Sequence, residues 1–327
     1  MGQTLPIRGV GDVGVLADAS PASLPPQAFT RAKNVRFDEG AVVRAPVFRA
    51  VKDLTFNPRF SYGTIPSSGH GTVLMVSDTY VIKEYANGTT TDRSGSISAM
   101  ASNQAPFTGS TLANITYFNR NDRIPVYRIN GGTDFADIPN QSSATGDNWV
   151  SSWRTESLRS YGDFLIALNM IEGSSSFPTR VRWSNLAQAN NVPDSWYAAD
   201  TTKSAGFNDL VQMKTGIVDG ATLGSNFIIY SKDQVWLMEF VGGTFIFNFR
   251  KLFSETGLIN ANCAIEVQNK HFCFGTDDIY THDGNSKVSI ADERVKSYIF
   301  NGINTDKLER CFVHHNPLLE EIYFYHQ

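Results

Sequence analysis

The sequence predicts an all-β protein: β-propeller-like repeats of antiparallel sheets, with an extended N-terminal arm and a β-hairpin platform segment. Three observations lead to this prediction. A pair of β-forming runs around a tight polar turn recurs along the chain, only 18% of the residues are charged, and 26 are glycine. Few charges and abundant glycine are typical of β-rich proteins with many tight turns.

The repeat is clearest at residues 72–82, 227–237 and 272–281, and three weaker copies complete the series. The spacings between successive copies are 42, 49, 63, 45 and 49 residues, measured between the anchor residues Leu74, Thr116, Leu165, Ile228, Cys273 and Ile322. A four-stranded propeller blade needs about 40–50 residues. The spacing therefore favours a propeller, a scaffold that does not by itself define a function.

Residues 1–60 form the first predicted unit, an N-terminal arm and β-hairpin platform segment. Its first 30 residues are rich in Gly, Ala, Ser and Pro, which predicts an extended arm packed on a neighbour. Residues 26–34 are predicted to form one short helical turn. The runs 35–37 and 41–44 flank a Gly-containing turn and predict a hairpin.

Residues 61–327 form the second predicted unit, a β-propeller-like domain. Turn signals such as Asn87-Gly88 and Asp283-Gly284 follow its repeats. The longest insert precedes the Ile228 repeat and predicts a loop on one propeller face. Residues 292–300 are the one predicted helix. The last run, 322–325, predicts a strand without a partner, completed by further chain, by another protein or by the arm.

Composition narrows the possible classes of protein. The net charge is −4, which does not favour a nucleic-acid binder by charge alone. Residues 1–60 carry 8 basic and 5 acidic side chains, a net charge of +3, so the remainder carries −7. The three cysteines are odd in number and form no C-x-x-C pair, which argues against a disulfide framework or a zinc site and favours a reducing compartment. Neither a signal peptide nor an apolar membrane span is recognisable.

Three stretches of the chain resemble one family in the same order. The first is residues 24–46, with Leu-Pro, an Ala-x-Asn-Val-Arg-Phe core, a Gly turn and a strand ending in Pro46. The second is residues 182–185 followed by 193–196, and the third is residues 253–258 followed by the repeat at 272–284. Together they resemble the tail nozzle proteins of short-tailed bacteriophages, also called tail tubular or packaged-DNA stabilization proteins.

The resemblance implies a structural virion protein, made in the host cytoplasm and then built into the phage tail, without catalytic residues, cofactor or metal. In that family a ring of usually six subunits lies below the portal and adaptor rings, carries tail fibres or spikes, and conducts the genome. Many of its chains are longer, with the propeller inserted beside a platform domain.

Charge fits such a conduit. An acidic body lets double-stranded DNA slide through without sequence specificity, whereas many Lys and Arg contacts would hold it. Arg31, Lys33, Arg36 and Arg44 are the predicted interaction residues, facing an acidic neighbouring ring; as an alternative they form a solvated face.

Other chemistry receives less support from the sequence. The turn holding Asp277, Asp278, His282 and Asp283 does not match an EF-hand loop, and the adjacent pair His314-His315 points to opposite faces of a strand. The five tryptophans either fill blade interfaces, which is favoured, or form a sugar platform. The alternatives left open are a propeller-type host-receptor or glycan-binding tail protein and a glycoside-cleaving propeller, which would need paired carboxylates.

Overall fold

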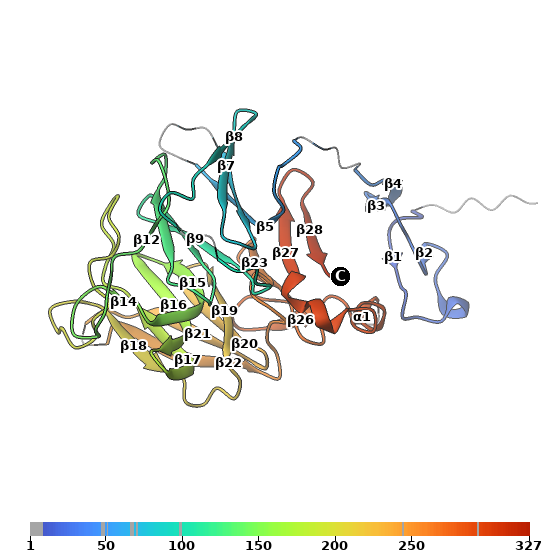
Figure 1. The fold of residues 1–327 in the computed structure, drawn as a ribbon. Helices are drawn as coiled ribbons and strands as arrows, with labels where there is room; N and C mark the ends of the chain where they lie inside the picture. The colour runs from blue at the N-terminus through green and yellow to red at the C-terminus, as the bar shows by residue number, and fades with distance from the viewer. Residues whose placement is uncertain are drawn as a thin grey trace, which may run out of the picture.

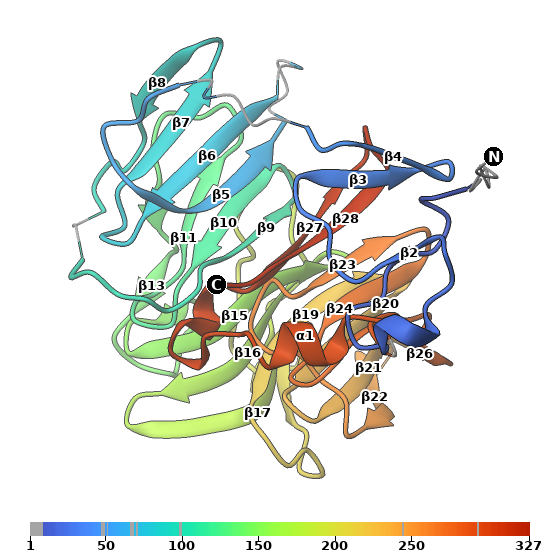
Figure 2. The same ribbon diagram turned by 90° about the vertical axis from the view of Figure 1, so that its right-hand side faces the viewer.

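The computed structural model describes residues 9–46, 50, 52–65, 69, 71–97, 100–243, 245–292 and 294–327. These residues form five four-stranded antiparallel sheets, arranged as blades of a β-propeller (Figure 1). In each blade the strands follow sequence order, and the first strands contact one another around the centre (Figure 2). The predicted all-β propeller is confirmed.

The five blades have the following strands. Blade 1 consists of β5 (Pro58–Thr64), β6 (Thr72–Ser77), β7 (Ile82–Ala86) and β8 (Thr89–Asp92). Blade 2 consists of β9 (Thr108–Leu112), β10 (Ile115–Asn119), β11 (Val126–Ile129) and β12 (Ala136–Asp137). Blade 3 consists of β15 (Trp153–Tyr161), β16 (Phe164–Glu172), β17 (Ser175–Trp183) and β18 (Gly206–Asp209). Blade 4 consists of β19 (Ile217–Leu223), β20 (Asn226–Ser231), β21 (Gln234–Phe240) and β22 (Phe247–Ser254). Blade 5 consists of β23 (Ala264–Val267), β24 (Lys270–Phe274), β25 (Ile279–His282) and β26 (Lys287–Ser289).

A two-stranded sheet follows blade 5. After α1 (Lys296–Phe300) and a 3-10 helix at Thr305–Arg310, β27 (Phe312–Asn316) pairs with β28 (Glu321–Tyr325). The prediction that the strand at 322–325 lacks a partner is therefore wrong, because β27 precedes it and pairs with it. β27 contacts β23 of blade 5, so the β27–β28 hairpin occupies a sixth position around the centre. The predicted helix over 292–300 is confirmed only for its second half, and Glu293 lies outside the described residues. None of the helices in the described ranges is long and apolar enough to cross a membrane.

All six anchor residues of the sequence repeat lie on second strands, namely β6, β10, β16, β20, β24 and β28. In the five blades the second strand has neighbours on both edges and is covered on both faces by adjacent blades, so its apolar run is nearly continuous. All five residues of β10 are buried, for example. The spacing therefore detects each blade at its most buried strand.

Two-residue turns close several hairpins of the blades. Ala113 and Asn114 join β9 to β10 with φ of 52° and 67°, and Gln268 and Asn269 join β23 to β24 with φ of 51° and 59°. Positive φ at both central residues matches the twist of the flanking strands. Asn87-Gly88 closes the predicted turn between β7 and β8 in the same way, with φ of 49° and 78°.

The hydrophobic core lies between neighbouring blades, in four clusters. Aromatic rings dominate the contacts: Trp183 of β17 packs edge to face on Phe247 of β22, with ring centroids 5.2 Å apart. All five tryptophans are buried, and they lie in the clusters between blades 2 and 3 or blades 3 and 4. The tryptophans therefore fill blade interfaces, as favoured by the sequence. Trp149 also belongs to a small parallel sheet of β13 (Asn140–Gln141) and β14 (Trp149–Val150).

A buried hydrogen-bond chain crosses the interface between blades 4 and 5. His271 Nε2 lies 2.7 Å from the carbonyl oxygen of Thr222, which can only accept, so Nε2 carries the hydrogen. His271 Nδ1 then accepts from the hydroxyl of Tyr230 at 2.5 Å. On the other side the backbone N–H of Gly284 donates to His282 Nδ1, so His282 Nε2 donates to the Tyr230 oxygen at 2.6 Å. Both histidines are therefore neutral and fixed in one tautomer.

The N-terminal arm packs against the segment that precedes β27. The backbone N–H of Asp18 donates to the carbonyl of Arg294, and its carboxylate accepts from the backbone N–H groups of Ser297 and Tyr298 at 2.8 and 3.0 Å. An acidic side chain at these free N–H groups caps α1. The packed arm predicted from composition is thus seen for these residues, whereas residues 1–8 lie outside the described ones.

Local structure in the arm differs partly from the prediction. The hairpin is confirmed as β3 (Val35–Asp38) and β4 (Ala41–Arg44). The predicted helical turn at 26–34 is wrong, because Ala28–Phe29 form β2, which pairs in parallel with β1 (Gly14–Val15). The single helical turn instead lies at Pro21–Ser23, where proline at the first position fits a helix start.

Trp236 tests the packing between blades 3 and 4. It is 6% exposed within that core cluster, so Trp236→Ala should lower the free energy of unfolding by about 3–5 kcal/mol. The control Phe245→Ala removes a ring that is 78% exposed and should change stability by less than about 0.5 kcal/mol. Urea denaturation of both variants measures the difference, and equal losses would contradict this placement.

Because of the buried histidines, we expect the free energy of unfolding to decrease in acid. Burial and the neighbouring His271 lower the pKa of His282 to about 3, below the value of about 6.5 in an unfolded chain. Between these values the unfolded chain binds the proton and the folded chain does not, so stability is full above about pH 6.5 and falls as pH decreases toward 3. His282→Phe should reduce the slope of unfolding free energy against pH by up to about 1.4 kcal/mol per pH unit in this window. An unchanged slope in urea titrations would contradict a buried, neutral His282.

Candidate functional site

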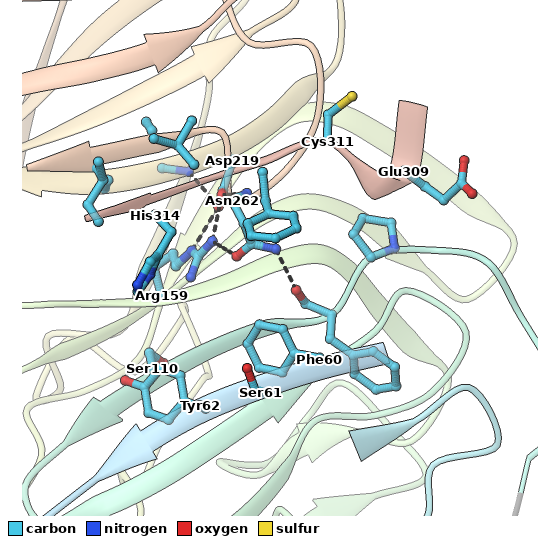
Figure 3. Close-up of a pocket in the computed structure, with 18 of the residues that line it drawn as sticks. Phe60, Ser61, Tyr62, Ser110, Arg159, Asp219, Asn262, Glu309, Cys311 and His314 are labelled. Atoms are coloured by element: carbon cyan, nitrogen blue, oxygen red, sulfur yellow. Dashed lines mark hydrogen bonds and ion pairs between the residues drawn. The ribbon is translucent and has the colours of Figure 1, made fainter. Parts of the chain in front are cut away.

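The main cavity of the described residues lies at the centre of the propeller and has a volume of about 700 Å³ (Figure 3). The first strand of every blade contributes to its wall, and β27 contributes the sixth side. Aromatic side chains line one part of it, including Phe60 and Tyr62 of β5 and Phe107 before β9. All five blades and β27 therefore form the wall of the cavity together.

An ion pair between Arg159 of β15 and Asp219 of β19 lies in the wall of this cavity. Arg159 Nε donates to Asp219 Oδ1 at 2.8 Å and Nη2 donates to Oδ2 at 2.5 Å. This two-point arrangement is the geometry in which guanidinium and carboxylate bind most strongly. Only 3% of Asp219 is exposed, so the pair joins blades 3 and 4 away from water.

Further hydrogen bonds extend the pair to two more blades. Arg159 Nη1 donates to the carbonyl of Gly109 on β9, and Nη2 donates to Asn262 Oδ1, directly before β23. The Asn262 backbone N–H donates to Asp219 Oδ2, and its side-chain amide donates to the carbonyl of Phe107. We call Arg159, Asp219 and Asn262 the central triad; it connects blades 2, 3, 4 and 5.

Glycine at position 109 permits this approach. A Cβ atom there would lie 2.9 Å from the Tyr62 ring, closer than real Cβ contacts, and 3.1 Å from the Phe60 ring, which is tighter than most of them. The bare backbone lets blade 1 aromatics cover β9, while the Gly109 carbonyl on the same strand meets Arg159.

The triad fixes the charge of Asp219. Burial alone would raise the pKa of this carboxyl, but Arg159, Ser157 and the Asn262 backbone N–H outweigh burial and hold the pKa below its usual value. The Ser157 hydroxyl donates to Oδ1 at 2.6 Å and the Gly220 N–H donates to it at 2.8 Å. A carboxylate held ionised and saturated in this way cannot serve as a general acid.

Two other features of the cavity bear on what it can hold. The Ser110 hydroxyl is buried at its wall and has no hydrogen-bond partner among the described residues. Arg59, Glu309, Arg310 and His314 line its rim, so the lining is mixed in charge. The volume lies within the range of about 300–1,000 Å³ typical of small-molecule pockets, and a DNA duplex does not fit into it.

The predicted interaction residues lie elsewhere, on the arm. Arg31, Lys33 and Arg44 are exposed, and the structure brings none of them to the cavity. Arg36 on β3 pairs with Asp38 at 2.5 Å and lies 3.8 Å from Glu321 of β28. The role of these four cations in binding a neighbouring ring remains a prediction.

The structure divides the predicted aspartate-rich turn into two ordinary turns, with Asp277 and Asp278 between β24 and β25 and Asp283 between β25 and β26. The Asp283 carboxylate accepts from the backbone N–H groups of Asn285 and Ser286, and Asp278 accepts from the Ser289 hydroxyl. His282 points into the core toward Tyr230. Among the residues that the structure describes, no three His, Cys, Asp or Glu side chains are grouped to hold a metal. The three cysteines are buried and free, as expected for Cys273 as a core residue.

Sequence reasoning did not identify the central triad. Arg159 and Asp219 lie 60 residues apart in strands that carry no motif. The available signal was Asp219 as the one charged residue of β19, and it does not identify Arg159 as its partner among the three charged residues of β15.

Comparison with known proteins gives a fold likeness only. No family model and no curated protein matches the chain. Among solved structures, the chain is similar to U3-55K, with 6% identity, a TM-score of 0.40, and coverage of 71% of this chain and 63% of that one. It is also similar to a chain of an active polycomb repressive complex 2 in the basal state, with 10% identity, a TM-score of 0.43, and coverage of 74% and 57%.

A third likeness is to a humanized mutant of the Chaetomium thermophilum Polycomb Repressive Complex 2 bound to the inhibitor GSK126. It has 9% identity, a TM-score of 0.41, and coverage of 79% of this chain and 65% of that one. The chain thus aligns with less than two thirds of each of these proteins.

We expect the central triad to contribute more to the free energy of unfolding than an ion pair at the outer edge of a blade. Asp219→Ala leaves Arg159 buried without its partner and should lower the free energy of unfolding by about 3–5 kcal/mol. Asp209→Ala is the matched control, because Asp209 is partly exposed and Arg180 keeps its second partner Glu172, so the change should cost about 1 kcal/mol or less. The double variant Arg159→Met/Asp219→Leu should regain most of the loss. Urea denaturation distinguishes these results, and a loss at Asp219 no larger than at Asp209 would contradict the role of the triad.

Proposed function

We propose that the chain is a subunit of the tail nozzle ring of a short-tailed bacteriophage. In this role it is a structural virion protein without enzymatic activity, assembled as a ring of about six copies below the portal and adaptor rings. The ring retains the packaged genome and conducts it during ejection. The observation that carries the proposal is the resemblance at residues 24–46, whose hairpin forms a unit of its own outside the blades.

The central cavity constrains where DNA would pass. The triad fills part of the propeller centre and the remaining cavity has the size of a small-molecule pocket. The proposed conduit therefore runs between copies of the chain, with the propellers forming its wall or its outer surface. The net charge of −7 on residues 61–327 supports a wall along which a duplex slides without being held.

The arm supplies the proposed contacts to neighbouring rings. Arg31, Lys33 and Arg44 are exposed on or beside the β3–β4 hairpin, so their charges are free to meet an acidic portal-adaptor surface. Tail fibres or spikes would bind the outer surface. Exposed charges of this kind act mainly on the rate and specificity of assembly.

The alternative is a propeller-type host-receptor or glycan-binding tail protein. The aromatic lining and the size of the cavity favour it, because small-molecule sites combine apolar walls with a few polar groups. The exposed tryptophan platform that such a protein would present is missing, since all five tryptophans are buried. A glycoside-cleaving mechanism finds less support, because the carboxylate of Asp219 is committed to Arg159.

Deletion of residues 1–20 tests the proposal. The propeller should remain folded, with a loss of about 1 kcal/mol from the missing Asp18 cap, because no strand of a blade is removed. Phage particles complemented with this variant should contain less of the chain and retain less DNA. Quantitative mass spectrometry of purified particles gives the copy number. Incorporation equal to that of the full chain would contradict an assembly role for the arm, and specific retention of a host glycan by the isolated chain would favour the alternative.

A further inference from the structure

We propose that the β3–β4 hairpin is a strap that completes a sixth blade by pairing β3 with the free edge of β28. The resulting sheet would have the strand order β27-β28-β3-β4. Such a strap would close the propeller whether or not the chain belongs to a tail nozzle.

The first support is the number of strands. Among the described residues, blades 1 to 5 each have four strands, whereas the sheet at the sixth position has two, and β28 pairs only with β27. A free strand edge presents unpaired N–H and C=O groups that readily accept another strand. The β3–β4 hairpin supplies the two strands that this sheet lacks, and β3 has four residues against five in β28.

The second support is proximity with matching faces. Arg36 Nη1 lies 3.8 Å from Glu321 Oε1, so a side chain of β3 reaches a side chain of β28. On β28, Ile322 and Phe324 pack on the core between blades 4 and 5, which leaves Glu321 on the opposite face. Placing Arg36 on the face of Glu321 puts the apolar neighbours of Arg36 on the core face.

Those neighbours are suited to that face. Val35 and Phe37 flank Arg36 and share the other side of β3, and Phe37 lies 5.5 Å from the Phe29 ring. If β3 pairs with β28, the apolar side chains of both strands therefore lie on one face of the sheet, and Arg36 and Glu321 lie on the other. Figure 1 shows the hairpin on the side of β28 that faces away from β27, and no hydrogen bond joins the two strands in this arrangement.

The third support is that Asp18 already attaches the N-terminal arm near the sixth position. Asp18 holds the arm on residues 294–298, which lead into β27, so this end of the arm is already attached to the sixth position. The hairpin lies between this tether and β5, the innermost strand of blade 1. Pairing of β3 with β28 in the same chain would thus link the last blade directly to the first.

The seam between blade 1 and the β27–β28 hairpin has no other such link among the described residues. Within the described ranges, no hydrogen bond joins blade 1 to the β27–β28 hairpin, whereas blades 1 and 2 are joined by bonds such as that from Arg120 Nη1 to the Asp78 carbonyl. The central cavity is lined on both sides of this seam, by Phe60 of β5 and Phe312 of β27. The strap would therefore close the ring and stabilise the wall of the cavity.

Amide hydrogen exchange of β28 tests the proposal. Amides of Glu321–Tyr325 that point away from β27 should exchange at least about tenfold slower than unprotected amides in the full chain, because β3 covers them. Arg36→Glu and Glu321→Arg should each remove most of that protection, and the double exchange should restore it. Arg44→Glu on β4 is the matched control for charge and should leave it unchanged.

Three results would overturn the proposal. Outward amides that exchange at the unprotected rate in the full chain show an open edge. Protection that survives both single variants shows that β3 is not the covering strand. Protection that disappears on dilution shows a strand donated by a second copy, which excludes closure within one chain.

Discussion

The buried ion pair between Arg159 and Asp219 is the interaction on which the centre of this propeller depends. Two charges removed from water are tolerated only when each is paired and fully hydrogen-bonded, and here Asn262 and the Gly109 carbonyl complete that requirement. Since those partners come from blades 2 to 5, the sheets must keep one mutual orientation to satisfy both charges. The aromatic clusters hold neighbouring blades together, and the central triad fixes how the blades are oriented relative to one another.

The sequence predicted the blades well because each contains one strand that is buried on both faces. Anchors such as Leu74 and Ile228 lie on second strands, where the apolar run is longest. The central triad could not be predicted, because its members come from two strands and a turn that meet only in the closed ring. The prediction of a helical turn at 26–34 was wrong for a related reason. Ala28 and Phe29 pair with β1, and local sequence propensity takes no account of such a partner.

The same structure limits how the proposed conduit can be built. A propeller centre that contains a fixed ion pair and a cavity of about 700 Å³ leaves no path for a duplex, so a channel requires several copies of the chain. The arm is the natural contact element, because it lies outside the blades, carries exposed cations and is held on the sixth position by Asp18. Closure of one propeller and assembly of several would then involve the same segment.

Electron-microscope class averaging of the purified chain, alone and mixed with its neighbouring tail proteins, tests the nozzle proposal most directly. A nozzle subunit should form rings with a central hole wide enough for duplex DNA, with the hole between propellers and none through an individual propeller. Single propellers in both samples would contradict a ring-forming subunit and would favour the receptor- or glycan-binding alternative.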